Sequence, residues 1–390
     1  MKSAPDTIDA DKRFLFKVAL IGNYVPDRQE SMERFTGLMA DGLRRRGHEV
    51  RVLRPQEVLK EAGGPFFSKW IGHLNKYLLF PRQLRKHAQW ADITHICDHS
   101  NAVYISQIGE MPHLITCHDL LAVRAALGEE TFCSPSVTGK ILQHWILRGL
   151  RRAKMIACDS TATKRDVERL IAPFSSGRVA MIPLGLNYPY RVLTDEDALV
   201  RLRSIPNLNS EERFLLHVGS SERRKNREGV LRIFSLIQES FRGQLVFAGA
   251  VLQPSLLKQA EDLGVLERIV VVERPDNASL EALYNRAFAL LFPSLSEGFG
   301  WPIIEAQACG CPVIASSSGP CPEVIGSGGI VHDVQDERGF ADSLLALVDT
   351  EHRDLTVARG FKNLQKFDSE RMVASYEQLY REVLKGKCRN

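Results

Sequence analysis

An apolar strand, a glycine-bearing loop and a helix follow one another between residues 289 and 310, and this succession constrains the fold more than any other feature. The run Ala289–Phe292 is entirely apolar, too short for a free-standing helix and ended by Pro293, so it predicts a buried parallel strand. Pro302 suits the first turn of a helix, because its missing N–H would be unpaired there in any case, and Gly310 ends that helix.

The loop between this strand and this helix favours a ligand that carries phosphate. A helix N-terminus presents unpaired N–H groups and a partial positive charge, and Gly298 and Gly300 let a ligand approach the backbone. Glu297 in the loop and Glu305 in the first turn of the predicted helix would repel a bare phosphate. We therefore expect both carboxylates to accept hydrogen bonds from hydroxyl groups that flank the phosphate, and a nucleotide sugar has that layout.

Residues 293–315 read P-S-x-x-E-G-F-G-x-P-x-x-E-A-x-A-C-G-x-P-V-I-A, which resembles the signature of retaining, family 4 type glycosyltransferases, the glycosyl transferases group 1. The resemblance implies an α/β chain of the GT-B fold, in which two Rossmann-like parallel-sheet domains face each other across a cleft. It implies a hexosyltransferase that moves a sugar from a nucleotide diphosphate sugar to an acceptor hydroxyl with retention of anomeric configuration, without a metal or cofactor. It also implies a role in polysaccharide or glycolipid biosynthesis, with a glycan, a lipid-linked molecule or a small molecule as acceptor.

The length of 390 residues favours two domains. The resemblance to the family implies three parts. They are an N-terminal acceptor-side domain over residues 1–186, a linker over 187–212 and a C-terminal nucleotide-sugar-binding domain over 213–369. The resemblance further implies that a last helix, 370–388, packs back onto the first domain.

Arg224 and Lys225 follow a predicted strand, Phe214–Gly219, and match a basic pair of the family. A guanidinium offers a planar fork and an ammonium a point charge, and both suit a diphosphate, although a solvated basic loop is the alternative. With His118 and Glu297 they form the catalytic set that the resemblance implies. The donor-binding set that it implies comprises Gly22, Arg274, Glu297, Gly298, Phe299, Gly300, Trp301 and Glu305.

His118 lies at the end of a predicted strand, and ligands of open parallel sheets bind at the carboxyl ends of strands. It resembles the family histidine that contacts the donor sugar, and a structural histidine is the alternative. Gly22 follows the first predicted strand alone, where relatives usually carry paired glycines, and is carried over as a phosphate-loop position. Arg34 lies in the helix that follows. It is either a solvated arginine or a residue that contacts the acceptor, and the sequence favours neither.

Positive charge gathers in the first half of the chain. Residues 1–190 carry 27 Lys and Arg against 19 Asp and Glu, whereas residues 191–390 carry 24 against 28. The basic half should face an anionic partner, but its charges are spread over separate helices and match no nucleic-acid motif, which argues against nucleic acid. No apolar run approaches the ~18 residues of a membrane span and the N-terminus is polar, so a cytoplasmic protein is expected.

The eight cysteines do not have the spacing of a zinc site. Cys309, Cys311 and Cys321 are close in sequence, but no histidine cluster completes a ligand set, so we expect buried thiols in a reducing compartment. There is also no D-x-D pair suited to holding a metal on a diphosphate. The sequence therefore predicts no metal site.

The stretch 65–86 lies in a region, 56–90, that reads as irregular, yet it carries an apolar stripe with basic residues around it. One interpretation is that it rests on an anionic membrane, which would give peripheral contact with the inner face of the membrane. The other is that the stripe packs into the core of the first domain. The stripe consists of Phe67, Trp70, Ile71, Leu74, Tyr77 and Leu78, and the basic residues are Lys69, Lys76, Arg82, Arg85 and Lys86.

Three other functions stay open on sequence grounds. A GT-B epimerase or a phosphorylase acting on nucleotide sugars or sugar phosphates would share the sheet and the two carboxylates. A pseudoenzyme would keep the fold without turnover, although intact Glu297, Glu305 and Lys225 argue against it. A nicotinamide dehydrogenase would need a G-x-G-x-x-G fingerprint, which the sequence after Gly22 does not supply.

Overall fold

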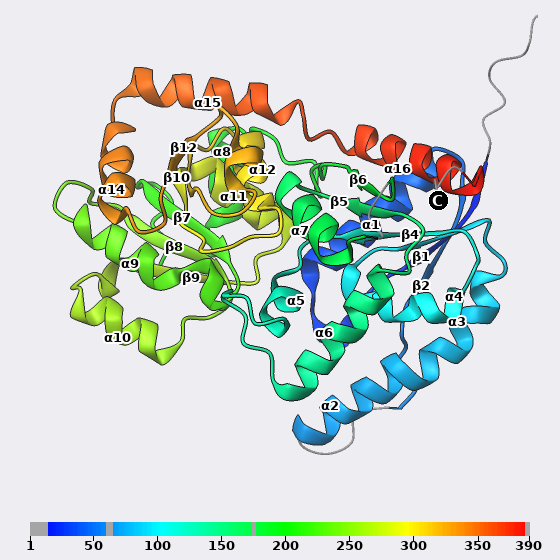
Figure 1. The fold of residues 1–390 in the computed structure, drawn as a ribbon. Coiled ribbons are helices and arrows are strands. Elements are labelled where there is room, and N and C mark those ends of the chain that lie inside the picture. Colours follow the sequence, from blue (N-terminus) through cyan, green and yellow to red (C-terminus); the bar gives the residue numbers. More distant parts are fainter. Residues whose placement is uncertain (1–14, 60–64, 174–176, 387–390) are drawn as a thin grey trace, which may run out of the picture.

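The computed structural model describes residues 15–59, 65–173 and 177–386, with the side chains of 65–69 outside the description. Within these residues the chain forms two parallel sheets of six strands each, which occupy the right and the left half of the molecule in Figure 1. The predicted α/β class with two Rossmann-like parallel sheets is confirmed.

The first sheet has the strand order β2-β1-β3-β4-β5-β6. Its four inner strands are almost wholly buried because the connecting helices cover both faces, whereas the edge strands β2 and β6 are partly exposed. Every residue of β3 and β4 is buried, for example. The strands are β1 Lys17–Ile21, β2 Glu49–Leu53, β3 Ile93–Ile96, β4 His113–Cys117, β5 Ile156–Cys158 and β6 Val179–Met181.

The second sheet has the order β12-β11-β10-β7-β8-β9. Its central strand β10 is the apolar run that opens the glycine-loop motif, and all of its residues are buried. The strands are β7 Phe214–Gly219, β8 Gln244–Gly249, β9 Ile269–Glu273, β10 Ala287–Phe292, β11 Val313–Ser316 and β12 Ile330–His332.

Helices connect the strands of both sheets. None of the helices in the described ranges is long and apolar enough to cross a bilayer. Those of the first half are α1 Glu30–Arg45, α2 Pro65–Leu74, α3 Phe80–Ala88, α4 Ile105–Ile108, α5 Leu121–Ala126, α6 Val137–Leu150 and α7 Thr161–Ile171. The others are α8 Asp195–Leu202, α9 Arg227–Leu236, α10 Pro254–Asp262, α11 Asn277–Arg286, α12 Trp301–Ala308, α13 Cys321–Ile325, α14 Glu337–Ala346, α15 Thr350–Leu364 and α16 Ser369–Leu384.

The end of the chain returns to the first half, where α16 packs against α1 and β4 (Figure 1). Two tyrosines of α16 reach buried polar groups of the first sheet. The Tyr376 hydroxyl lies 2.9 Å from Oγ1 of Thr116, and the Tyr380 hydroxyl lies 2.8 Å from Nδ1 of His95. The first half therefore takes its last covering helix from the far end of the sequence.

The chain passes between the halves twice, near Gly185 and near Ser369, and these two segments pack on each other. A Cβ atom at Gly185 would lie 2.4 Å from Cα of Ser369, so only glycine fits there. The Leu186 N–H donates to the carbonyl of Phe367 at 3.2 Å, and the indole N–H of Trp301 donates to the carbonyl of Gly185 at 3.0 Å. These contacts join the first half, the second half and the returning chain at one point.

The prediction that residues 56–90 are irregular is wrong for 65–88. Helices α2 and α3 are joined by a π-helical turn, Asn75–Leu79, so this stretch is helical throughout. Pro81 lies just after the π-helical turn, where the carbonyl of Lys76 accepts a hydrogen bond from the Tyr104 hydroxyl at 3.1 Å. The proposed core packing is wrong for part of the stripe, since Trp70, Leu74 and Leu78 are exposed. The side chains of Phe67 and Lys69 lie outside the described residues.

Candidate active site

Glu297 forms a buried ion-pair cluster with the predicted basic pair. Its Oε1 lies 2.6 Å from Nζ of Lys225, and its Oε2 lies 2.8 Å from Nη1 of Arg224. Glu297 and Lys225 are each only 8% exposed. Lys225 is therefore not a solvated lysine, and Arg224, whose side chain is 26% exposed, is held by the same carboxylate.

The local fold of residues 223–226 explains how the two basic side chains reach Glu297. They form a single 3-10 turn after β7, closed by Asn226 in the left-handed conformation that asparagine tolerates. The Asn226 side chain caps α9 and also donates to the carbonyl of Pro293 at 2.9 Å. The N–H of Leu295 donates to the carbonyl of Arg224 at 2.7 Å, so the loops after β7 and β10 are tied together.

Pairing with Lys225 and Arg224 keeps the Glu297 carboxylate ionised. Burial raises the pKa of Glu297, but Lys225 and Arg224 outweigh it, and the net effect lowers that pKa. Two cations thus share one buried carboxylate. Nη2 of Arg224 also lies 2.7 Å from Oε2 of Glu222, whose side chain is 60% exposed. Glu222 is a surface counter-ion that an incoming anion can replace, since an exposed pair is worth little.

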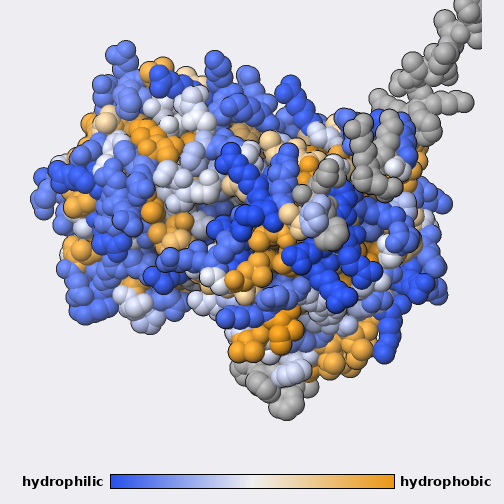
Figure 2. All heavy atoms as spheres, viewed as in Figure 1, coloured by the Kyte–Doolittle hydropathy of each residue, from blue (hydrophilic) through white to orange (hydrophobic). Residues whose placement is uncertain are grey.

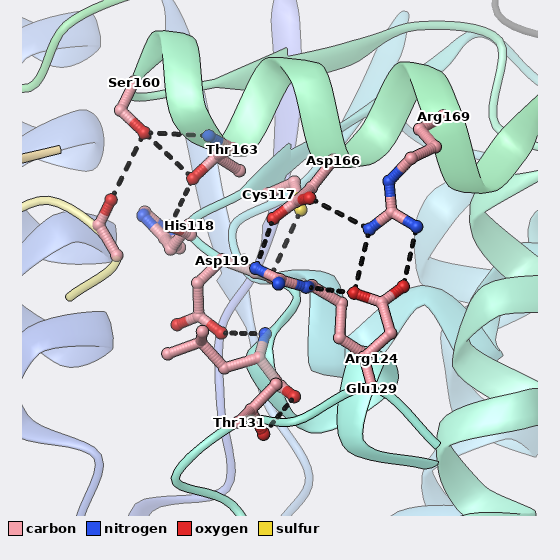
Figure 3. A network of polar contacts seen from close by, with 12 residues as sticks. Cys117, His118, Asp119, Arg124, Glu129, Thr131, Ser160, Thr163, Asp166 and Arg169 are labelled. Atoms are coloured by element: carbon pink, nitrogen blue, oxygen red, sulfur yellow. Dashed lines mark hydrogen bonds and ion pairs between the residues drawn. The ribbon is translucent and has the colours of Figure 1, made fainter. Parts of the chain in front are cut away.

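The glycine loop packs directly on the first half of the molecule. A Cβ at Gly298 would lie 2.6 Å from the carbonyl oxygen of His118, so glycine is needed for this approach. Figure 3 shows Ser160, the N-cap residue of α7, and Thr163 of α7 beside His118. The Ser160 hydroxyl donates to the carbonyl of Gly298 at 3.3 Å, and the Thr163 hydroxyl donates to the carbonyl of His118 at 3.2 Å.

Gly300 is the N-cap of α12 and has a φ of 102°, which favours glycine. The neighbouring aromatic side chains point into the protein, because Phe299 is 6% and Trp301 is 8% exposed. The Phe299 ring packs against that of Phe367 with centroids 5.8 Å apart. A ligand at this helix start would therefore meet backbone N–H groups, and both aromatic residues hold the loop in place.

Glu305 lies in the second turn of α12 rather than in the first, where the sequence placed it. It is 2% exposed. Its Oε1 accepts from Nδ2 of Asn187 at 2.8 Å, and its Oε2 accepts from the hydroxyl of Tyr284 at 2.8 Å. Burial raises the pKa of Glu305, and the positive charge of Arg34 on α1 opposes this rise. The Arg34 side chain is half-buried.

Both ring nitrogens of His118 are occupied inside the protein. Nδ1 lies 3.0 Å from Oδ2 of Asp159, and Nε2 lies 3.0 Å from the carbonyl oxygen of Cys97. A carbonyl can only accept, so Nε2 carries a proton. Burial raises the pKa of Asp159 to about 6, and the same carboxylate raises the pKa of His118 against the effect of burial. Contact between His118 and a donor sugar remains a prediction, because it requires the ring to release one of these partners.

Two family models match this chain. The model described as "Glycosyl transferases group 1" matches residues 201–360, and "Glycosyltransferase Family 4" matches residues 32–188. The chain belongs to the group 1 glycosyltransferases. Its two facing parallel sheets are those of the GT-B type, as the sequence resemblance implied.

Curated relatives of this glycosyltransferase include two sugar-transferring enzymes. "O-antigen chain mannosyltransferase B" of Escherichia coli is 26% identical over 237 residues, which cover 60% of this chain and 61% of the relative. "D-inositol 3-phosphate glycosyltransferase" of Nocardiopsis dassonvillei is 33% identical over 147 residues, covering 34% and 33%. The matches therefore span less than two thirds of these relatives.

Solved structures resemble the glycosyltransferase over nearly its whole length. Sucrose-phosphate synthase from Thermosynechococcus elongatus has a TM-score of 0.73 at 20% identity, covering 95% of this chain and 99% of that one. Alr3699/HepE of Anabaena, in complex with UDP and glucose, has a TM-score of 0.71 at 14% identity, covering 94% and 100%. At these identities the likeness establishes the fold alone.

Within the described residues, no hydrogen bond joins Gly22 or Arg274 to Glu297 or Glu305. A Cβ at Gly22 would lie 3.0 Å from Nε of Arg54, so the Arg54 side chain covers this glycine. Arg274 is exposed, has a φ of 44°, and donates its N–H to the carbonyl of Gly249 at 2.9 Å. Their donor-binding roles remain predictions.

Sequence reasoning missed three side chains of the site: Tyr284, Asn187 and Asp159. Tyr284 lies on α11, and neither its spacing nor its neighbours mark it as a partner of Glu305. Asn187 directly follows the predicted first domain, residues 1–186, and only that position could have indicated it. Asp159 directly follows β5 and pairs with His118, and its place at a strand end could have indicated it.

No group of three or more His, Cys, Asp or Glu in the described ranges could hold a metal ion. The seven cysteines described there are free, and Cys309, Cys311 and Cys321 are buried, as predicted. Cys388 lies outside the described residues.

Proposed function

We propose that this protein transfers a hexosyl group from a nucleotide diphosphate sugar to an acceptor hydroxyl, with retention of anomeric configuration and without a metal ion. The observation that carries the proposal is the buried Arg224–Glu297–Lys225 cluster, which lies between two strand-end loops beside the start of α12. Buried ion pairs at strand ends are weak evidence for stability, because desolvation offsets their attraction, so a functional role accounts for them better.

The basic pair is suited to the leaving diphosphate. Arg224 exchanges the exposed Glu222 for a phosphate oxygen, and Lys225 contributes a compact charge. The N–H groups at the start of α12 add the positive end of a helix. Preorganised charges of this kind stabilise the negative charge that develops on the leaving group, which a metal ion does in other enzymes.

The two glutamates are suited to hydroxyl groups of the donor. Glu305 accepts from the ribose, with Asn187 and Tyr284 holding its carboxylate in orientation. Glu297 accepts from the donor sugar while its two cations keep it ionised. A protonated glutamate would compete as a donor, so the lowered pKa of Glu297 supports this role.

The retention that the family resemblance implies would proceed here without a covalent glycosyl–enzyme intermediate. Glu297 is fixed between two cations and Glu305 between two hydrogen-bond donors, so neither is poised as a nucleophile for a double displacement. We infer departure and attack on the same face of the sugar. The leaving phosphate takes the proton of the acceptor hydroxyl.

Donor and acceptor classes follow the relatives. The mannosyltransferase relatives support a hexosyl donor, and the neighbour bound to UDP and glucose supports a nucleoside diphosphate in this fold. We propose a glycan, a lipid-linked molecule or a small molecule as acceptor, in polysaccharide or glycolipid synthesis.

The proposal is tested first by donor binding. Thermal unfolding is measured with UDP, GDP, ADP, their sugars and NAD, with and without EDTA. A donor present at about 100 times its Kd adds about 2.7 kcal/mol to the stability. We expect one nucleotide to stabilise the protein in EDTA, and Glu305→Gln to lose most of that effect. Stabilisation by NAD alone, or by no nucleotide, would contradict the proposal.

A further inference from the structure

Two helices of the first half carry apolar side chains on their outer surface. On α2 and the π-helical turn that follows it, Trp70, Leu74 and Leu78 are 58%, 40% and 45% exposed. Residues spaced by four lie one above another on a helix, so the three form a row. The stripe that the sequence revealed is therefore in part a surface feature.

A second row lies on α6. Val137, Ile141 and Trp145 are 77%, 67% and 41% exposed, again at a spacing of four. The Trp145 ring lies 5.6 Å, centroid to centroid, from that of Tyr77 in the π-helical turn, so the two rows adjoin. We call Trp70, Leu74, Leu78, Val137, Ile141 and Trp145 the outer face. Figure 2 shows hydrophobic atoms gathered at the lower end of the molecule, where Figure 1 places α2.

Both helices bury other apolar side chains in the core, so core packing does not explain the apolar side chains of the outer face. Helix α6 already buries Ile146, Leu147 and Leu150 in the first half. The connected helix Pro65–Ala88 likewise buries Phe80 and Leu84. A helix of a water-soluble domain normally has a polar surface opposite its buried one, whereas here the outer side also carries large apolar groups. Contiguous exposed apolar groups mark a site of association.

Charge identifies the partner. The outer row of α6 is flanked by a second exposed row at the same spacing, Lys140, His144 and Arg148. The sequence 65–91 contains five Lys and Arg and no Asp or Glu, and 131–158 contains no Asp or Glu. One of the five, Lys76, is paired with Asp27 at 2.8 Å. Two copies of so basic a surface would repel each other, while an anionic surface would attract either one.

We propose that the outer face docks on an anionic lipid bilayer. The apolar rows enter the boundary between headgroups and acyl chains, and Lys140 and Arg148 contact lipid phosphates. The arrangement presents one side of the first half to the membrane and leaves the Glu297 cluster, on the second half, in water. Docking needs no turnover, so it is tested independently of the proposed glycosyl transfer.

Vesicle flotation of the full chain tests this proposal. We expect binding to vesicles of mixed phosphatidylcholine and phosphatidylglycerol at low salt, and weak binding to phosphatidylcholine alone. The triple variant Trp70→Ser, Val137→Ser, Ile141→Ser should bind about tenfold more weakly, and so should Lys140→Glu, Arg148→Glu. A matched control, Val200→Ser, Val251→Ser, Leu355→Ser, replaces side chains of comparable exposure elsewhere and should bind as the wild type does.

Fluorescence quenching by brominated acyl chains locates the contact. Trp70 and Trp145 belong to the outer face, whereas Trp301 is buried. We expect strong quenching in anionic vesicles, and loss of most of it in Trp70→Phe, Trp145→Phe, which keeps apolar groups and therefore keeps binding.

Three results would overturn the proposal. They are absence of flotation at low salt, equal binding by the wild type and the triple serine variant, and unchanged quenching in the phenylalanine variant. Dimerisation of the wild type that the serine variant abolishes, without vesicle binding, would assign the outer face to a second copy instead. Thermal unfolding of every variant checks that the fold is retained.

Discussion

At the scale of single residues, the site depends on how buried charges are shared. The glutamates and the basic pair were found from the sequence because each belongs to a short contiguous motif. Tyr284, Asn187 and Asp159 were not, because each reaches its partner from a different element. A short motif predicts residues that are close in sequence and act together. It does not predict contacts between residues of different elements, because these depend on how the elements pack.

The first residue-scale prediction concerns Lys225. Lys225→Ala should lower turnover by about 100-fold, since it removes a charge that faces the leaving group. It should also destabilise the fold by roughly 3 kcal/mol, because Glu297 stays buried with one cation fewer. Adding Glu297→Gln should restore most of the stability but not the turnover. Urea unfolding and a nucleotide-release assay measure the two effects, and a double variant as unstable as Lys225→Ala would refute the shared-charge account.

The second concerns His99, whose Nδ1 lies 3.1 Å from Oδ1 of Asp98. Burial lowers the pKa of His99, but the carboxylates of Asp98, Asp119 and Asp159 outweigh it and raise the pKa to about 9. An unfolded histidine has a pKa of about 6.5, so the charge stabilises the fold below that pH and the contribution is lost as pH rises through about 9. We expect Tm to fall across this interval, and less steeply in His99→Gln. Parallel pH profiles would show that His99 is not the cause.

At the scale of elements, the strands and most helices could be predicted because parallel strands are short apolar runs between glycines and polar turns. The helix over 65–88 could be predicted only in part: the apolar residues of 65–86 have helical spacing, but Pro81 and the mixed polarity resemble a loop. Tertiary contacts keep it helical. The buried Asn75 side chain accepts from the N–H of Leu59 at 3.2 Å and donates to the carbonyl of Leu59 at 3.1 Å and to the Tyr24 hydroxyl at 3.2 Å.

Asn75→Ala tests this explanation. It should destabilise the protein by about 1–3 kcal/mol, because backbone groups of Leu59 and the Tyr24 hydroxyl each lose a partner. Leu78→Ala, at an exposed position of the same turn, should change stability by less than about 0.5 kcal/mol. Urea unfolding compares them, and equal effects would contradict a specific role for the Asn75 amide.

At the scale of the whole molecule, the halves are joined where two crossings pack around Gly185. Gly185→Ala should destabilise by more than about 1 kcal/mol, because its Cβ would meet the backbone of Ser369. Gly37→Ala is the matched control, since that helical glycine has open space around it and alanine there should stabilise by about 0.5–1 kcal/mol. Equal stability of the two variants in thermal unfolding would contradict close packing between Gly185 and Ser369.

The central claim, retaining transfer from a nucleotide sugar, is tested most directly by NMR of the reaction products. The donor selected by thermal unfolding is incubated with acceptors in EDTA. The one-bond carbon–proton coupling constant at the new anomeric carbon is then compared with that of the donor. The account predicts release of the nucleoside diphosphate and a product with the anomeric configuration of the donor. A product of inverted configuration, or an epimerised donor without transfer, would contradict it.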